Sequence, residues 1–498
     1  MEITDLTPAE RRVWDAFPHG ARVDVREGPE ENAADGAGWG PERTVRAEVL
    51  TALLLGGAAA EGRVAGLDLK GFRVTGKLNL KYATVEHAIR LRGCWFERKP
   101  LLYGARLRAF VLSDSALPGL TASTVTVDVV LRLSCCRITG PVRLAGARIA
   151  GGLFLTRAVI GPLAPDGADP DEPEGSAEPP LQFNHADIGT DVIAPGLTVY
   201  GQTRINGATV GGQINLEGAR LLNPGGEALY AETLSVGTDV RARGLRAEGR
   251  VNLTGSRIPG QLGLAYARLV NPGGTALRAS SCAIGEVWLR ACDTIQGAVN
   301  LRRSQFDMLY VEPAGWPGTV RLDGLGYRSL RPHLPPEERL PVLEREDAGY
   351  LPYAYEQLAA AYRTAGDEGA ARSVQLAKLR RHRRTLPRHA RVWGLLQDAT
   401  VGYGFRPLRA AGWLVALLCT GALAYGLRPP APLKPGEAPE FNPVFYTLDL
   451  MLPIIGFGQE EAFGPRGWYQ WLSYLLIVTG WVLATTTAAG VSRSLSRQ

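Results

Sequence analysis

Hydrophobic and polar residues alternate in short stretches over the middle half of the chain, and the stretches return about every eleven residues. Each stretch carries two alternating apolar residues followed by a small one, as in Val142-x-Leu144-x-x-Ala147. The interval is marked by Ile138, Ile149 and Ile160. Alternation over three residues is typical of short strands that point one side chain inward and the next outward. The pattern extends from about residue 64 to about residue 322.

A longer repeat of 48 residues contains these stretches. The sequence VGGQINLEGARLLNPGGEALYA at 210–231 returns as IPGQLGLAYARLVNPGGTALRA at 258–279. The repeat units lie near 149–209, 210–257 and 258–305, and the first is lengthened by an acidic insertion at 164–180 that we expect to be a solvated loop. Short strands that recur with bends at a fixed interval predict a mainly β fold. We expect a parallel β-solenoid with two to four stretches in each rung.

The repeats resemble pentapeptide-repeat and other right-handed parallel β-helix proteins, whose rungs stack small and aliphatic residues inward. An interval of eleven residues departs from the strict five-residue form. Glycines at the turns are expected to adopt positive φ: Gly140, Gly151, Gly211 and Gly260. Four asparagines occupy like outward positions, Asn79, Asn215, Asn252 and Asn300. We interpret them as solvated strand positions, and the alternative is a polar ladder that binds a ligand.

Helical segments flank the repeats. Residues 1–60 predict a helical N-terminal cap, because Thr7-Pro8-Ala9-Glu10 has the pattern of a capping box and 45–55 is apolar enough to cover the first rung. The repeats occupy 61–330 and a linker 331–352. Residues 353–400 predict a helical hairpin, similar to one tetratricopeptide-like repeat, followed by a basic juxtamembrane segment. Residues 401–498 predict a membrane domain.

The membrane prediction rests on two uncharged stretches, 410–427 and 467–491, which are long enough as helices to cross a bilayer. The basic segment that precedes them is expected to contact anionic lipids through Arg380, Arg381, Arg383, Arg384, Arg388 and Arg391. Because basic residues gather before the first stretch, and such residues favour the cytoplasmic side, we predict a plasma-membrane protein with two spans and both termini in the cytoplasm. Small residues spaced by four in the second stretch predict helix–helix contact and thus a homo-oligomer.

The segment between the two stretches, 441–458, is apolar but contains Asp449 and Pro453. We expect a re-entrant or interfacial helix. A span, a short helix, Gly-Phe-Gly and a second span together resemble the two-span potassium-channel pore. The pore-loop positions of that resemblance are Ile454, Ile455, Gly456, Phe457 and Gly458, with Ile454 where the filter has threonine.

Composition narrows the function classes. The chain has 498 residues, a net charge of +6 and a pI of about 9.0, which favours anionic partners. Nucleic acid is not expected, because no aromatic residues are interleaved with the basic run. The six cysteines form no CxxC pair, so we expect free thiols, and we interpret the adjacent Cys135 and Cys136 as packed side chains. GxGxxG, GxxxxGK[ST], HExxH and CxxCH are all absent from the sequence, and we predict no catalytic, cofactor-binding or metal-binding residues.

Three further segments carry a resemblance that covers nearly the whole chain: YEQLAAAYRTAG at 355–366, YTLDLMLPIIGFGQEEAF at 446–463 and GWVLATTTAAG at 480–490. They resemble actinobacterial proteins labelled membrane-associated oxidoreductases, which implies a redox activity. The residues themselves favour a membrane-anchored cytoplasmic scaffold whose repeat surface binds an unknown protein partner. Enzymatic activity stays open, and the alternatives are the membrane oxidoreductase and an oligomeric ion-channel-like pore.

Overall fold

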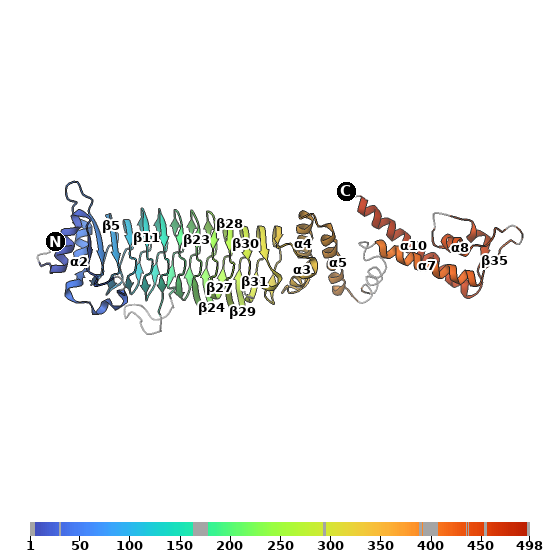
Figure 1. Cartoon of the computed structure of the whole chain (residues 1–498), viewed down its shortest axis with the longest axis horizontal. Coiled ribbons are helices and arrows are strands. Elements are labelled where there is room, and N and C mark those ends of the chain that lie inside the picture. Colours follow the sequence, from blue (N-terminus) through green and yellow to red (C-terminus); the bar gives the residue numbers. More distant parts are fainter. Residues whose placement is uncertain are drawn as a thin grey trace. The chain divides into compact units, whose positions relative to one another are not determined.

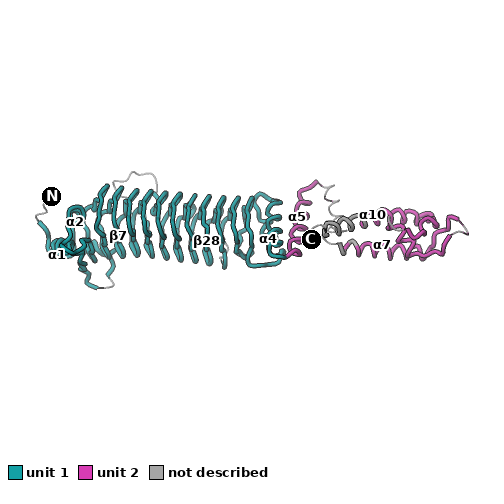
Figure 2. The backbone as a smooth tube through the Cα atoms, turned by 90° about the horizontal axis from the view of Figure 1, so that it is seen from above, with its two compact units in different colours: residues 1–366 teal, residues 367–498 magenta. Residues whose placement is uncertain are grey.

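The structure, a computed structural model, describes residues 5–28, 31–162, 178–291, 295–387, 391, 407–434, 436, 438–452 and 456–495. It divides into two compact units, residues 1–366 and 367–498 (Figure 2). The division falls at Gly366, inside the region 353–400 for which the sequence predicts a helical hairpin. Each unit is therefore described by itself.

Unit 1 is dominated by a parallel β-solenoid of about 11 turns (Figure 1). Its strands form two sheets, and every pairing between its described strands is parallel. The first sheet consists of β1 (Arg22–Asp24), β3 (Gly66–Lys70), β5 (Thr84–Arg92), β7 (Arg106–Val111), β10 (Thr126–Val127), β11 (Val130–Arg132), β14 (Arg148–Ile149), β15 (Gly152–Phe154), β18 (Asp187–Ile188), β19 (Val192–Ile193), β22 (Thr209–Val210), β23 (Ile214–Asn215), β25 (Ser235–Val236), β26 (Val240–Arg241), β28 (Arg257–Gly263), β30 (Ala283–Leu289), β32 (Gln305–Val311) and β34 (Gly326–Arg331).

The second sheet faces the first across the core. It consists of β2 (Thr44–Arg46), β4 (Arg73–Thr75), β6 (Trp95–Phe96), β8 (Ala116–Leu117), β9 (Leu120–Thr121), β12 (Arg137–Ile138), β13 (Val142–Arg143), β16 (Val159–Ile160), β17 (Leu181–Gln182), β20 (Thr198–Tyr200), β21 (Thr203–Arg204), β24 (Arg220–Tyr230), β27 (Arg246–Asn252), β29 (Arg268–Arg278), β31 (Gln296–Asn300) and β33 (Val320–Arg321). The predicted β-solenoid is confirmed.

Each turn of the solenoid uses two of the eleven-residue stretches, one in each sheet. In the first sheet Thr209, Ser235, Arg257 and Ala283 are successive partners, so turns of 26, 22 and 26 residues follow one another. The 48-residue repeat is therefore two turns. The longer turns hold an additional Asn-Pro-Gly-Gly within β24 and β29. The sequence left two to four stretches per rung open, and the structure has two.

Inward residues of successive turns stack into continuous apolar columns. One column in the first sheet contains Val85, Leu107, Val127, Ile149 and Ile188, all buried. Because the side chains alternate along each strand, their neighbours in sequence point outward. The beginning of the acidic insertion lies outside the described residues. At its end, Glu178 accepts hydrogen bonds from the Arg143 side chain.

The corner conformations differ from the sequence prediction. Positive φ occurs at corner residues such as Asp114, Thr124 and Gly146. Gly140, Gly151, Gly211 and Gly260 do not have positive φ. They are glycines for another reason, namely the close approach of the preceding turn: a Cβ on Gly151 would lie 1.8 Å from the carbonyl oxygen of Val129. The prediction of positive φ at these four positions was wrong.

Helices close the N-terminal end of the solenoid. They are α1 (Pro8–Ala16) and α2 (Ala47–Gly56), with the 3-10 helices η1 (Phe17–His19), η2 (Ala33–Gly38) and η3 (Pro41–Arg43). The predicted capping box is present, since Thr7 accepts from the Glu10 amide and the Glu10 carboxylate accepts from the Thr7 amide. Leu50, Leu53 and Leu54 of α2 are buried in the solenoid core, which covers its first turn.

At the other end of unit 1, η4 (Pro313–Gly315) precedes the last strands, and α3 (Pro336–Leu343) and α4 (Pro352–Thr364) follow them. Helix α3 lies in the region expected to be a linker. The Gln357 side chain of α4 donates to the Tyr327 carbonyl oxygen at 2.6 Å, which ties this helix to β34.

Unit 2 contains α5 (Glu368–Thr385), α7 (Pro407–Leu427), α8 (Pro443–Met451), α9 (Gln459–Ala462) and α10 (Trp468–Leu495), with a small antiparallel pair of strands, β35 (Ala431–Pro432) and β36 (Phe463–Gly464). Helices α7, α8 and α10 contact one another. Their shared core includes Tyr425, Tyr446, Leu450 and Leu476.

The two predicted membrane spans are not supported. Helices α7 and α10 occupy the stretches 410–427 and 467–491, as expected for helical segments. Among the residues that the structure describes, however, no helix has both the length and the apolar character needed to cross a membrane.

The close stacking at Gly151 predicts that a single added methyl group strongly lowers the stability of the fold. Gly151→Ala should lower the free energy of unfolding by about 2–3 kcal/mol, because the added Cβ overlaps a carbonyl oxygen that cannot withdraw from the ladder. Chemical denaturation followed by circular dichroism measures this. The matched control is Gly244→Ala, at a corner with φ +67° and open space around it, where a loss of about 1 kcal/mol is expected. Equal losses would contradict the stacking explanation.

A second prediction concerns Glu10, which is buried and bonded to Arg46 (Nε–Oε1 2.7 Å). Burial alone raises its pKa, but hydrogen bonds from Arg46 and the Thr7 and Arg46 amides bring the pKa down to about 2. The folded pKa is below the unfolded one, so this stabilisation is present above about pH 4.5 and is lost as the pH falls toward 2. Glu10→Gln should cost about 1–3 kcal/mol at pH 7 and much less near pH 2, where the carboxyl group is about half protonated.

Urea unfolding between pH 7 and pH 2 tests this. Glu48→Gln, at an exposed position in the first turn of α2, is the control and should change stability little at any pH. A Glu10→Gln deficit that stays constant down to pH 2 would show that the charge of Glu10 is not the cause.

Candidate interaction surface

The outward side chains of the second sheet include three arginines on consecutive turns. Arg220, Arg246 and Arg268 are partners in the ladder of β24, β27 and β29, and all three are exposed. Turns of a parallel ladder are about 4.8 Å apart, so the three residues form a strip, here called the arginine strip. None of them forms an ion pair with a carboxylate in the described ranges of the chain. The strip therefore concentrates three positive charges, and the column beside it carries one exposed carboxylate, Glu248.

Further along the same strands, a column of outward residues pairs its charges internally. The Glu227 carboxylate accepts from Arg250 Nη1 at 3.3 Å and from Asn252 Nδ2 at 3.1 Å. Glu232 accepts from the same Asn252 amide at 3.0 Å and from the Tyr230 hydroxyl at 3.0 Å. Because these carboxylates are occupied by their own neighbours, they do not neutralise the arginine strip.

The four asparagines of the repeats have a local structural role. The side-chain oxygen of Asn215 accepts the Glu217 amide at 2.9 Å, and Asn79, Asn252 and Asn300 accept the amide two residues onward in the same way. Each asparagine thus closes a turn at a corner of the solenoid. Asn252 and Asn300 are buried, so they are less exposed than the sequence interpretation expected.

The first sheet carries an aromatic pair near its C-terminal end. The rings of Trp288 and Tyr310 are stacked, with centroids 4.9 Å apart and planes 6° apart. They are partners on adjacent turns, and the next residue in this column is Arg331. The indole N–H of Trp288 donates to Glu286 at 2.8 Å. The hydrogen bond to Glu286 holds the Trp288 ring, and the stacked pair forms a flat, partly exposed surface.

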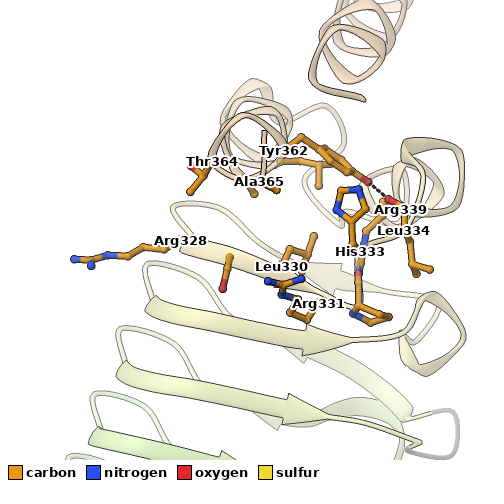
Figure 3. A pocket seen from close by; sticks show the side chains of 13 residues that line it. Arg328, Leu330, Arg331, His333, Leu334, Arg339, Tyr362, Thr364 and Ala365 are labelled. Atoms are coloured by element: carbon orange, nitrogen blue, oxygen red, sulfur yellow. Dashed lines mark hydrogen bonds between the residues drawn. The ribbon is translucent and has the colours of Figure 1, made fainter. Parts of the chain in front are cut away.

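A cavity of about 240 Å³ lies between the last strand and the helices that follow it (Figure 3). It is lined by Arg328, Ser329, Leu330, Arg331, Pro332, His333, Leu334, Arg339, Leu358, Ala361, Tyr362, Thr364 and Ala365. The Tyr362 hydroxyl donates to the Leu334 carbonyl oxygen at 2.5 Å and fixes one wall. All of these residues belong to unit 1.

The described cysteines are free and mostly buried. Burial raises the pKa of Cys94 to about 12 and raises the pKa of Cys136 as well. Cys135 is a corner residue with φ +58°, and Cys419 is exposed. The buried thiols pack in the core, as predicted for Cys136. No group of three or more His, Cys, Asp and Glu in the described part of the chain could hold a metal ion.

Unit 2 exposes many large apolar side chains. Trp468 and Trp471 on α10 are 80% and 69% exposed. Further exposed positions on α7, α8 and α10 are Trp413, Val415, Leu423, Leu427, Val444, Phe445, Tyr474, Leu475, Val478, Trp481 and Val482. Large exposed apolar surfaces of this kind mark sites of contact with protein or lipid.

The predicted pore-loop residues are only partly described. Ile454 and Ile455 lie outside the described residues, and Gly456, Phe457 and Gly458 lead into α9. The buried Asp449 carboxylate of α8 accepts from the Phe457 amide, from the Gln459 amide at 2.7 Å and from the Glu460 amide at 3.1 Å. Asp449, which the sequence marked only as a polar interruption, thus organises this turn.

The predicted lipid-contact arginines lie mainly on α5. Arg380, Arg381 and Arg383 are partly exposed, and Arg384 is exposed in the last turn. Arg391 is exposed and donates to the Leu386 carbonyl oxygen at 2.6 Å, while Arg388 lies outside the described residues. Their lipid contact stays a prediction.

Sequence reasoning missed both the arginine strip and the cavity, for different reasons. Arg220 and Arg268 occupy the same position of the 48-residue repeat, so the strip had a detectable signal. The cavity had none, because Arg331, His333 and Tyr362 come from a strand end, a connection and a helix that only folding brings together.

Comparisons with protein-family models, with curated proteins and with solved structures found no match to this chain.

Proposed function

We propose that the chain is a membrane-attached interaction scaffold, in which unit 1 supplies a binding surface and unit 2 attaches to the cytoplasmic face of the plasma membrane. The observation that carries the attachment is the apolar outer surface of α7, α8 and α10. Its exposed tryptophans have amphipathic rings, which favour the interface between lipid and water. The arginines of α5 add attraction to anionic headgroups.

The support for the scaffold role is the repetition of the outward surface. A parallel solenoid repeats its outward positions turn after turn, so one type of side chain can be presented along a line. The arginine strip does this with positive charge that described neighbours leave unpaired. We infer that the partner of unit 1 has an acidic surface or an acidic extended segment. Assembly of several copies through unit 2 belongs to the same proposal.

No specific observation among the described residues favours either alternative. The oxidoreductase alternative gains no cofactor site from the buried, packed thiols. For the pore alternative, the amides of Phe457, Gln459 and Glu460 converge on one carboxylate and form a closed turn.

Attachment to lipid predicts that the full-length protein binds vesicles through the tryptophans of α10. Phosphatidylcholine vesicles containing about 30% phosphatidylglycerol should carry the protein to the top of a flotation gradient. Trp468→Ser combined with Trp471→Ser should reduce the bound partition coefficient about tenfold or more, because each exposed indole contributes about 1 kcal/mol or more on burial.

The matched control is Tyr82→Ser combined with Tyr266→Ser, two exposed aromatic residues of the solenoid. This variant should bind vesicles as the unaltered chain does. Equal binding by all three proteins would contradict attachment through α10.

The arginine strip predicts binding of an acidic peptide. A fluorescent decaglutamate peptide should bind the full-length protein with an affinity that falls as salt rises. Arg220→Gln, Arg246→Gln and Arg268→Gln together should weaken binding at least tenfold in fluorescence anisotropy. The control removes the same charge from the first sheet, with Arg106→Gln, Arg148→Gln and Arg257→Gln. Equal weakening by both triple variants would show general charge attraction and contradict a specific strip.

A further inference from the structure

The cavity at the C-terminal end of the solenoid has walls from the last strand, from two helices and from the connection 332–334. Residues 328–331 belong to β34, Arg339 belongs to α3, and Leu358, Ala361 and Tyr362 belong to α4. Leu358, Ala361 and Tyr362 are buried, whereas Thr364 and Ala365 are exposed. The cavity thus has an apolar floor and opens beside the end of α4.

The charged groups that line the cavity are all basic. Arg331 and Arg339 lie on its walls with His333, and its lining contains no carboxylate. Arg328 also lines it, but its side chain extends away from the other labelled residues (Figure 3) and pairs with Asp307 at 3.4 Å. The positive charge that faces the cavity therefore comes from Arg331 and Arg339, with His333 as a further polar group.

Arg339 differs from Arg331 because its side chain is buried. Only 5% of the residue is exposed, and the carboxylate that attracts its charge, Glu338, is the preceding residue and is not part of the cavity lining. Nη1 donates to the Val311 carbonyl oxygen at 2.9 Å and Nη2 donates to the Pro332 carbonyl oxygen at 2.5 Å. Neutral carbonyl groups compensate a buried cation only in part, so an anion nearby would stabilise it.

We propose that this cavity binds a small organic anion, a phosphate monoester or a carboxylate whose apolar group lies on the floor made by Leu358 and Ala361. Arg331 is placed to donate to the anion, and the buried charge of Arg339 adds to the attraction. The volume of about 240 Å³ suits a ligand of roughly ten non-hydrogen atoms and excludes a macromolecule.

Phenyl phosphate is the first probe, because it joins a phosphate monoester to one flat apolar ring. Isothermal titration of the full-length protein should show one saturable site, whose affinity falls as salt rises. Phenol, which has the ring without the phosphate, should bind at least tenfold more weakly. Absence of saturable binding by phenyl phosphate and by benzoate up to about 10 mM would overturn the proposal.

Arg331→Gln tests the site directly, since Arg331 is exposed at the end of β34. It should weaken phenyl phosphate binding at least tenfold, the loss expected for one charge-assisted hydrogen bond. The matched control is Arg241→Gln, which removes an arginine from the same outward column of the first sheet, far along the solenoid from the cavity. Equal weakening by both variants would overturn the proposal.

Ala365→Trp provides a test that leaves every basic residue in place. Ala365 is exposed at the mouth of the cavity, so an indole there should obstruct entry and reduce binding at least tenfold. An unchanged unfolding midpoint shows that the variant folds. A correctly folded Ala365→Trp protein with unchanged affinity would place the ligand elsewhere and contradict the proposal.

A phosphate monoester can be a free metabolite or the headgroup of phosphatidic acid. Vesicles with about 20% phosphatidic acid distinguish the two sources when phenyl phosphate is titrated in their presence. If the vesicles compete with phenyl phosphate and Arg331→Gln abolishes this competition, the ligand is the lipid headgroup. If phenyl phosphate binds equally well with and without the vesicles, the ligand is a free metabolite. Vesicle attachment through α10 is measured separately, so its failure does not affect this test.

Discussion

The distance between turns of a parallel ladder, about 4.8 Å, is the constraint on which the rest of the structure depends. Every turn must repeat the path of the turn before it, because its amides donate to the carbonyl groups of its neighbour. Some turns are longer because additional residues bulge within a strand, as Asn-Pro-Gly-Gly does in β24 and β29. The repeats require glycine at Gly151, where even one methyl group would meet the preceding carbonyl oxygen.

A ladder of this kind has two ends, and each exposes unpaired backbone groups unless other elements cover it. The N-terminal end is covered by α2 and is held by the ion pair between Glu10 and Arg46. The C-terminal end is closed by α3 and α4, through the Arg339 and Gln357 hydrogen bonds to backbone carbonyl groups. Helices do not match the flat end of a β-solenoid as closely as another turn does. The cavity lies at this junction, and the basic residues that line it make it positively charged.

Outward positions of the solenoid are free of the packing constraint, and function is therefore expected there. Charges in the column of Glu227 and Asn252 are used internally, whereas no ion pair of the described residues involves the arginine strip. Unit 2 differs from unit 1 in the character of its surface. Its core is small, and its outer surface carries apolar side chains instead of charged ones. We base the proposal that the protein links a partner to a lipid surface on this charged face of unit 1 and this apolar face of unit 2.

Periodicity alone determined the solenoid, because a regular ladder forces its spacing onto the sequence as an eleven-residue interval. Local sequence pattern determined the capping box at Thr7 and the helical segments of unit 2, because these depend on neighbours within a few residues. Local pattern did not determine why Gly151 is glycine or what Asp449 binds, since those answers lie in contacts with another turn and with a loop. The two predicted spans rested on apolar composition, but no described helix has both the length and the apolar character needed to cross a membrane. Only the tertiary structure decided that each turn uses two stretches and that Arg331, Arg339 and Tyr362 meet around one cavity, because spatial proximity between distant segments leaves no periodic signal in the chain.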